Sequence, residues 1–104
     1  MRARVLVVDD DEGMRRALEE SLARRGLHVV VAGNGKEAME KMERATFDLV
    51  ITDVRMPGKD GMDLLNFVKR TNPLLPVIVI TAYGTIEDAV RAIKHGAFDY
   101  LEKP

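Results

Sequence analysis

The chain has 104 residues, 46% of them hydrophobic, and its 16 basic and 17 acidic side chains leave a formal net charge of −1 at pH 7. This length suits one domain, residues 1–104, and the balanced charge argues against a nucleic-acid surface on it. The absence of cysteine excludes a disulfide scaffold and a thiolate metal site. No apolar stretch approaches the roughly 20 residues that cross a bilayer, and acids directly after the first short apolar run exclude a signal peptide. We therefore expect a cytoplasmic protein without membrane contact.

Short apolar runs alternate with segments of helical periodicity along the chain. The first run is β-branched and ends at three consecutive acids, as expected for a strand that is buried on both faces. The third run closes on Asp53, the fourth on Thr81, and Lys103 follows the fifth. The expected strands are residues 5–8, 29–32, 49–51, 77–80 and 98–101.

Four helices are expected between these strands. Gly26 is a stop for the first helix, and Asn34 with Glu37 resembles a capping box before the second. Asp60 and Thr85 are candidate caps for the third and fourth helices. The expected apolar faces are Met14, Ala17, Leu18 and Leu22 in the first helix, Ala38, Met42 and Ala45 in the second, Leu64, Leu65 and Val68 in the third, and Ile86, Ala89, Val90 and Ile93 in the fourth. Strands separated by helices run parallel with right-handed crossovers, so the pattern predicts an α/β fold with a doubly wound, five-stranded parallel sheet.

Polar side chains follow several of the predicted strands. Parallel strands bring their carboxyl ends to one edge of the sheet, where open α/β sheets bind ligands. If the first and third strands are neighbours, Asp10 and Asp53 share a pocket, and two carboxylates about 4 Å apart repel by about 4 kcal/mol at an effective dielectric near 20. The pocket therefore requires a cation, for which Lys103 offers one charge and a divalent metal two. Carboxylate oxygens, a backbone carbonyl and waters are the hard-oxygen ligands that suit Mg²⁺.

The acidic run also has a structural interpretation, because acids stabilise a helix N-terminus. That interpretation is preferred for Asp11 and Glu12. It does not explain why a second buried strand also ends in an acid, so a site is preferred for Asp10 and Asp53.

Four segments of the chain resemble the response-regulator receiver domain of two-component signalling. They are VLVVDDDEGMR at 5–15, DLVITDVRMPGKDGMDLL at 48–65, PVIVITAYGT at 76–85 and GAFDYLEKP at 96–104. The resemblance implies a flavodoxin-like sheet of strand order 2-1-3-4-5 and phosphorylation by a sensor histidine kinase. The last third of the chain is most similar to receivers of nitrogen-regulation-type transcription activators, which implies a C-terminal, transcriptional output domain. A second copy of the chain is a further candidate partner.

Individual roles follow from the same resemblance. Asp53 is implied as the phosphoacceptor, with Asp9 and Asp10 as the acidic pair of the Mg²⁺ site. Asp10 would touch the metal directly, Asp9 mostly through water. Asp53 and the backbone carbonyl of Arg55 would complete the protein's share of the metal ligands.

The resemblance also implies a switch. Thr81 and Lys103 would contact phosphoryl oxygens, and Tyr100 would respond to the movement of Thr81. Each of the two switch residues has a simpler interpretation: Thr81 as a hydroxyl that caps its own loop, and Tyr100 as a half-exposed strand aromatic. The arginine pairs 15–16 and 24–25 are interpreted as solvated faces of the first helix, and docking of a kinase on them is left open.

Two alternative functions are considered. Haloacid-dehalogenase-type phosphatases also have a first strand that ends in Asp with a second Asp two positions on, as Asp9 and Asp11 do, but they usually have Thr or Val where this chain has Gly13, and they need a longer body. A receiver-like interaction module that works without phosphorylation is the other alternative.

The receiver family uses five helices, whereas this chain offers four. By resemblance, the second, third and fourth helices share one face of the sheet and leave the first alone on the other. Residues 49–51 and 77–80 are apolar on both parities, so both faces need cover. We expect a fifth helix after Pro104 and, without it, an exposed apolar patch beside the first helix.

Overall fold

The computed structural model describes residues 2–54, 61–82 and 85–103. The proposed cap Asp60 and the carbonyl of Arg55 lie outside these residues. Strands and helices alternate in the order β1 Arg4–Val8, α1 Glu12–Arg24, β2 His28–Ala32, α2 Gly35–Arg44, β3 Leu49–Asp53, α3 Gly61–Thr71, β4 Val77–Thr81, α4 Ile86–Lys94 and β5 Asp99–Glu102.

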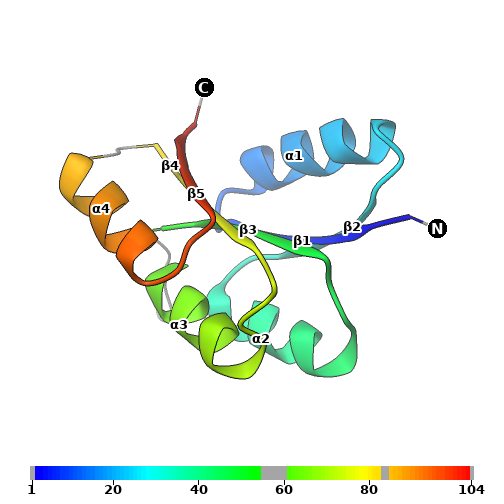
Figure 1. Ribbon diagram of the computed structural model, residues 1–104. Helices are drawn as coiled ribbons and strands as arrows, with labels where there is room; N and C mark the ends of the chain where they lie inside the picture. Colours follow the sequence, from blue (N-terminus) through cyan, green and yellow to red (C-terminus); the bar gives the residue numbers. More distant parts are fainter. Residues whose placement is uncertain (1, 55–60, 83–84, 104) are drawn as a thin grey trace.

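The strands form one sheet of order β2-β1-β3-β4-β5, and every neighbouring pair is parallel. The predicted fold class and strand order are therefore confirmed. In Figure 1, α1 covers one face of the sheet, while α2, α3 and α4 lie on the other. The described residues include no fifth helix. None of the described helices is both long and apolar enough to cross a bilayer.

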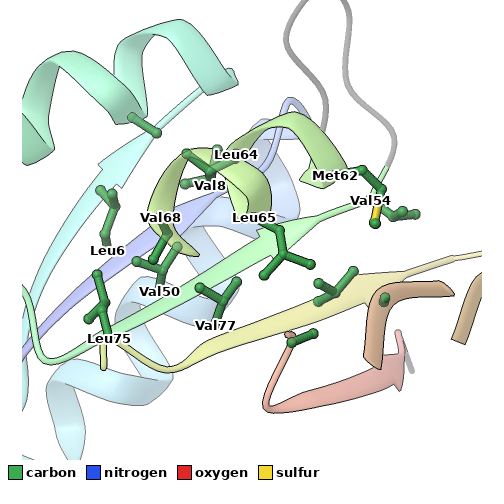
Figure 2. Close-up of a cluster of buried hydrophobic side chains, with 14 of the residues drawn as sticks. Leu6, Val8, Val50, Val54, Met62, Leu64, Leu65, Val68, Leu75 and Val77 are labelled. Atoms are coloured by element: carbon green, nitrogen blue, oxygen red, sulfur yellow. The ribbon is translucent and has the colours of Figure 1, made fainter. Parts of the chain in front are cut away.

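Alternate side chains of each strand enter two separate apolar clusters, which explains why the strands are apolar on both parities. On the side of α2, α3 and α4, Leu65 and Val68 of α3 point toward Val50 and Val77 of the sheet (Figure 2). All four of these side chains are fully buried. This cluster is the larger of the two.

The opposite face is covered by α1 alone, as expected. Its cluster contains the buried Val7, Ile51 and Ile80, against which Leu22 of α1 is only partly buried. Leu101 is paired with Ile80 in the β4–β5 register, so it lies on this face, and it is 46% exposed. The described part of the chain thus leaves this face incompletely covered at β5, although most exposed large hydrophobic residues lie elsewhere.

The orientation predicted for α4 was wrong. Ile86, Val90 and Ile93 are 84%, 46% and 48% exposed, whereas Ala92 is completely buried. The sequence places two apolar stripes side by side on this helix, and periodicity alone merges them into one face. In the tertiary structure the small alanine side lies against the sheet, and the branched stripe faces outward. Phe98 is also outside β5 and 74% exposed, so the fifth strand begins one residue later than predicted.

The predicted caps within the described residues are confirmed. The Asn34 side chain accepts a hydrogen bond from the amide of Glu37 at 2.8 Å, and Thr85 Oγ1 accepts one from the amide of Asp88 at 3.0 Å. The Glu37 carboxylate accepts from the amide of Gly33, one residue earlier than in a standard capping box. Gly26 follows α1 with φ +86°, a conformation that favours glycine at a helix end.

Candidate functional site

The site lies at the carboxyl edge of the sheet, where β1 and β3 end beside each other. Val8 pairs with Thr52, so the next residues, Asp9 and Asp53, are neighbours. One carboxylate oxygen from each of Asp9, Asp10 and Asp53 lies within 4.8 Å of the others, and we call these three residues the acid cluster. Asp9 is fully buried, Asp53 is 7% exposed and Asp10 is exposed. The edge of the sheet therefore brings together acids that are more than 40 positions apart.

Lys103 enters the acid cluster from β5. Its ammonium lies 2.8 Å from Asp9 Oδ2 and 2.9 Å from Asp53 Oδ2, and its side chain is only 11% exposed. The backbone amide of Lys103 donates to the carbonyl of Thr81 at 2.7 Å. This hydrogen bond extends the β4–β5 ladder past the end of β5 and fixes the backbone position of Lys103. The lysine thus depends on strand pairing for its place in the site.

Burial and charge shift the pKa values in this pocket. Desolvation raises the pKa of the Asp9 carboxyl and outweighs the opposing effect of Lys103 and of the Asp11 amide. Desolvation by itself would lower the pKa of the Lys103 ammonium, but its close contacts with the Asp9 and Asp53 carboxylates and their negative charges raise it overall. The lysine therefore stays charged at neutral pH and serves as a fixed cation.

The donor set fits a divalent metal ion. At full ionisation, three carboxylates and one ammonium give 1 − 3 = −2, which one divalent cation neutralises. Asp9 Oδ2 is buried and, although it is close to the Lys103 ammonium, accepts no hydrogen bond of good geometry from the described residues. An oxygen-only set that is partly open to water suits Mg²⁺. The expected ligand from Arg55 lies outside the described residues.

The backbone at Asp53 is held by close packing against α3. A Cβ atom on Gly61 would lie 2.1 Å from the carbonyl oxygen of Asp53 and 2.8 Å from Cα of Val54, so only glycine fits there. The amide of Gly61 donates to the carbonyl of Val54 at 3.1 Å. Sequence reasoning missed this role, and the Asp-Gly pair immediately before the apolar face of α3 was the available signal.

Thr81 and Tyr100 lie on the same face of the sheet, because Val79 pairs with Tyr100 and Thr81 lies two residues further along β4. Thr81 is 1% exposed. The Tyr100 hydroxyl is buried, and among the described residues no partner gives it a hydrogen bond of good geometry. Desolvation and the nearby Asp88 carboxylate raise the pKa of the Tyr100 phenol. The hydroxyl end of the ring is therefore turned inward.

The interpretation of the 15–16 arginine pair was half right. Arg16 is exposed and forms a 3.1 Å ion pair with Glu12 on the helix surface. Arg15 is half-buried, and its Nη1 donates to the backbone carbonyl of Asp9 at 2.8 Å. Asp11 is the N-cap of α1, as its structural interpretation predicted, and accepts from the amides of Gly13 and Met14.

Fold and site together define a flavodoxin-like α/β domain with a pocket of three acids and one lysine at the carboxyl edge of its sheet. Residues 5–104 match the profile of the response regulator receiver domain, and the chain belongs to this family. It is thus a receiver domain of the two-component signalling type, as the sequence motifs implied.

Relatives of known role point to one branch of the family. The chain is 47% identical over 103 residues to the DNA-binding transcriptional regulator NtrC of Escherichia coli K12, a match that covers 99% of this chain and 22% of the relative. It is 45% identical over 103 residues to the response regulator protein PilR of Pseudomonas aeruginosa, covering 99% and 23%. The chain therefore spans less than a quarter of the length of these relatives.

Solved structures agree with this assignment. The beryllofluoride-activated NtrC4 receiver domain dimer superposes with a TM-score of 0.91 at 42% identity, covering 97% of this chain and 84% of that one. NtrX from Brucella abortus in complex with ADP superposes with a TM-score of 0.94 at 37% identity, covering 100% and 24%.

Proposed function

We propose that this receiver domain accepts a phosphoryl group on Asp53 from the phosphohistidine of a sensor kinase and passes the signal to an output domain. The observation that carries the proposal is the convergence of Lys103 with the acid cluster at one sheet edge. Membership of the receiver family supports it. The relatives NtrC and PilR are transcriptional or response regulators, which supports a transcriptional output outside residues 1–104. We place the domain in the cytoplasm, with no nucleic acid bound through it.

In phosphoryl transfer the protein contributes mainly by positioning the reacting groups and by neutralising charge. A carboxylate oxygen of Asp53 attacks phosphorus, the P–N bond to the kinase histidine breaks, and the imidazole leaves with the bonding electrons and keeps a proton. The product is an acyl phosphate on Asp53. Lys103 stabilises negative charge on the transferred oxygens and, after transfer, on the product. Mg²⁺, held by Asp9, Asp10, Asp53 and the carbonyl of Arg55, would supply positive charge to the same oxygens.

The readout joins Thr81 to the outward face of α4. In our proposal the Thr81 hydroxyl donates to a phosphoryl oxygen and moves away from Tyr100, whose partly buried ring packs against the larger apolar cluster. A shift from about 1:99 to 99:1 needs about 5.5 kcal/mol of differential binding. One or two charge-assisted hydrogen bonds give about 1.5–3 kcal/mol each, so the isolated domain should shift incompletely.

A second copy of the chain would supply the rest. We define the α4 stripe as Ile86, Val90 and Ile93. These side chains form an exposed apolar surface, which a partner could remove from contact with water. The structurally similar NtrC4 receiver domain is a dimer in its beryllofluoride-activated solution structure. We therefore propose that activation favours pairing of two domains through α4.

Mass spectrometry of the intact domain tests the proposed acceptor. Incubation with acetyl phosphate and Mg²⁺ should add one phosphoryl group, and hydroxylamine should remove it. Asp53→Ala should gain none, while the control Asp63→Asn, at an exposed acid on α3, should be modified like the wild type. An adduct of the same yield on Asp53→Ala would refute the assignment of Asp53.

The same preparation separates the two alternatives. A phosphatase would turn over many equivalents of a generic phosphate monoester, whereas a receiver consumes its own acceptor once per phosphoryl group. A module that works without phosphorylation would show no Mg²⁺-dependent mass increase at all.

A further inference from the structure

Arg15 connects the first helix to the backbone of the acid cluster. Its Nη1 donates to the carbonyl oxygen of Asp9 at 2.8 Å, from a position one turn inside α1. The β1–β2 register ends at Val8 and Ala32, and the amide of Asp9 donates to Ala32 at 3.1 Å. The carbonyl of Asp9 is therefore beyond the regular ladder and depends on a side chain for its partner.

This carbonyl controls the direction of the next acid. The carbonyl of Asp9 and the amide of Asp10 belong to one planar peptide unit, so a hydrogen bond that fixes the carbonyl also fixes the backbone amide and Cα of Asp10. The other side of the turn is also held, because the amide of Asp11 donates to Asp9 Oδ1 at 2.9 Å. Asp10 itself is exposed. The hydrogen bond from Arg15 is thus well placed to orient the Asp10 carboxylate toward Asp9 and Asp53.

Glu37 lies near the guanidinium of Arg15 and acts on it through its charge. A Cβ atom on Gly33 would lie 3.4 Å from Arg15 Nη1 and 3.6 Å from Glu37 Oε2, so both charged groups flank the same glycine. The Glu37 carboxylate is itself fixed by the amide of Gly33 at 2.9 Å and by Lys41 at 3.1 Å. The hydrogen bond from the Gly33 amide lowers the pKa of Glu37 most, and the positive charges of Lys41 and Arg15 lower it further.

We propose that Arg15 is a positioning residue for the metal-binding acids, and that the nearby charge of Glu37 connects the β2–α2 turn to the site through it. The inference rests on the proposed Mg²⁺ site but concerns a residue that touches neither metal nor phosphoryl group. Partners that orient metal ligands without binding the metal commonly change affinity by about 10–100-fold when removed. Arg15→Gln should therefore weaken Mg²⁺ binding about tenfold.

Calorimetric titration with Mg²⁺ alone tests this proposal on the wild type and four variants. Arg16→Gln is the matched control, because Arg16 is adjacent, exposed and paired only on the helix surface. Arg15→Lys should restore part of the affinity, since lysine can donate to the carbonyl but lacks the planar fork that also faces Glu37. Leu22→Ala loosens the packing of α1 away from the acids and should lower Tm without changing the Kd for Mg²⁺.

Amide NMR spectra of the metal-free protein give an independent readout. The Asp10 and Asp11 amide signals should shift in Arg15→Gln and stay in place in Arg16→Gln. A wild-type protein that fails to bind Mg²⁺ would refute the proposed function itself. A wild type that binds, with Arg15→Gln binding equally well, would refute only the role of Arg15. Equal weakening in Leu22→Ala and Arg15→Gln at equal loss of Tm would show that Arg15 is merely structural.

Discussion

The ammonium of Lys103 lies 2.9 Å from Asp53 Oδ2, across 50 positions of sequence, and neutralises part of the acid cluster in the absence of metal. Lys103→Met should therefore have opposite effects on two measurements. Metal-free protein should lose stability, by up to about 3–5 kcal/mol, because buried carboxylates lose their counter-charge. Mg²⁺ affinity should rise, since the metal then meets the full negative charge.

Denaturant melts with and without Mg²⁺, together with calorimetry, measure both effects. Phosphorylation by acetyl phosphate should be slower in Lys103→Met even at saturating Mg²⁺, because the lysine no longer stabilises the transferred oxygens. Unchanged phosphorylation would remove Lys103 from the proposed chemistry.

Metal binding should require acids from two strands. Asp10→Asn and Asp53→Asn should each abolish calorimetric binding of Mg²⁺, because each removes one of the three carboxylates that cluster among the described residues. Asp11→Asn is the control: Asp11 caps α1 rather than facing the cluster, and asparagine caps about as well. Full Mg²⁺ binding in Asp10→Asn would contradict the proposed site.

Thr81 should couple the acceptor to α4. With beryllofluoride as the phosphoryl mimic, NMR signals of α4 should move in the wild type and move less in Thr81→Ala, which cannot donate to the mimic. The Tyr100 ring should respond in the same way, although its inward position here indicates a change in packing rather than a full swing. An intact α4 shift in Thr81→Ala would place the coupling elsewhere.

The proposed dimer surface predicts a concentration-dependent change of size. The beryllofluoride-treated domain should be larger in sedimentation than the untreated one, and Val90→Asp should suppress the difference because it places a charge in the α4 stripe. Leu74→Asp is the control, since Leu74 is 92% exposed in the turn after α3 and is not part of the α4 stripe. Equal suppression by both variants would indicate non-specific association.

Glu37 should make stability depend on pH. Its pKa in the folded protein is lowered from the usual glutamate value of 4.5, chiefly by the hydrogen bond from the Gly33 amide, so its contribution to stability is fully present above about pH 4.5 and is lost as pH falls through the lowered value. Glu37→Gln should flatten this part of the stability profile. Glu43→Gln, at an exposed acid on the same helix, should leave the acid-side slope as it is in the wild type. Urea melts between about pH 3 and pH 6 make the comparison.

Local sequence patterns determined the helices and strands and most of the site residues at the carboxyl edge of the sheet. Apolar runs on both parities specify strands that are covered on two faces, and side chains such as Asn34 and Thr85 mark helix starts because they satisfy free amides within three residues. Asp53 and Thr81 could be placed at strand ends from their position in the chain, since a strand of known direction has a known carboxyl end.

Only the tertiary structure decided which of several local options prevailed. The sequence of α4 offers two adjacent apolar stripes, and packing against the sheet selected the one with Ala92. Arg15 is indistinguishable from Arg16 by charge or spacing, and differs only because β1 ends where its guanidinium can reach the carbonyl of Asp9. In the sequence, Gly61 has no feature that sets it apart from other glycines. The tertiary structure shows that a Cβ atom there would lie 2.1 Å from the carbonyl oxygen of Asp53 at the end of β3. Such choices depend on contacts between segments that are far apart in the chain, and no local propensity contains them.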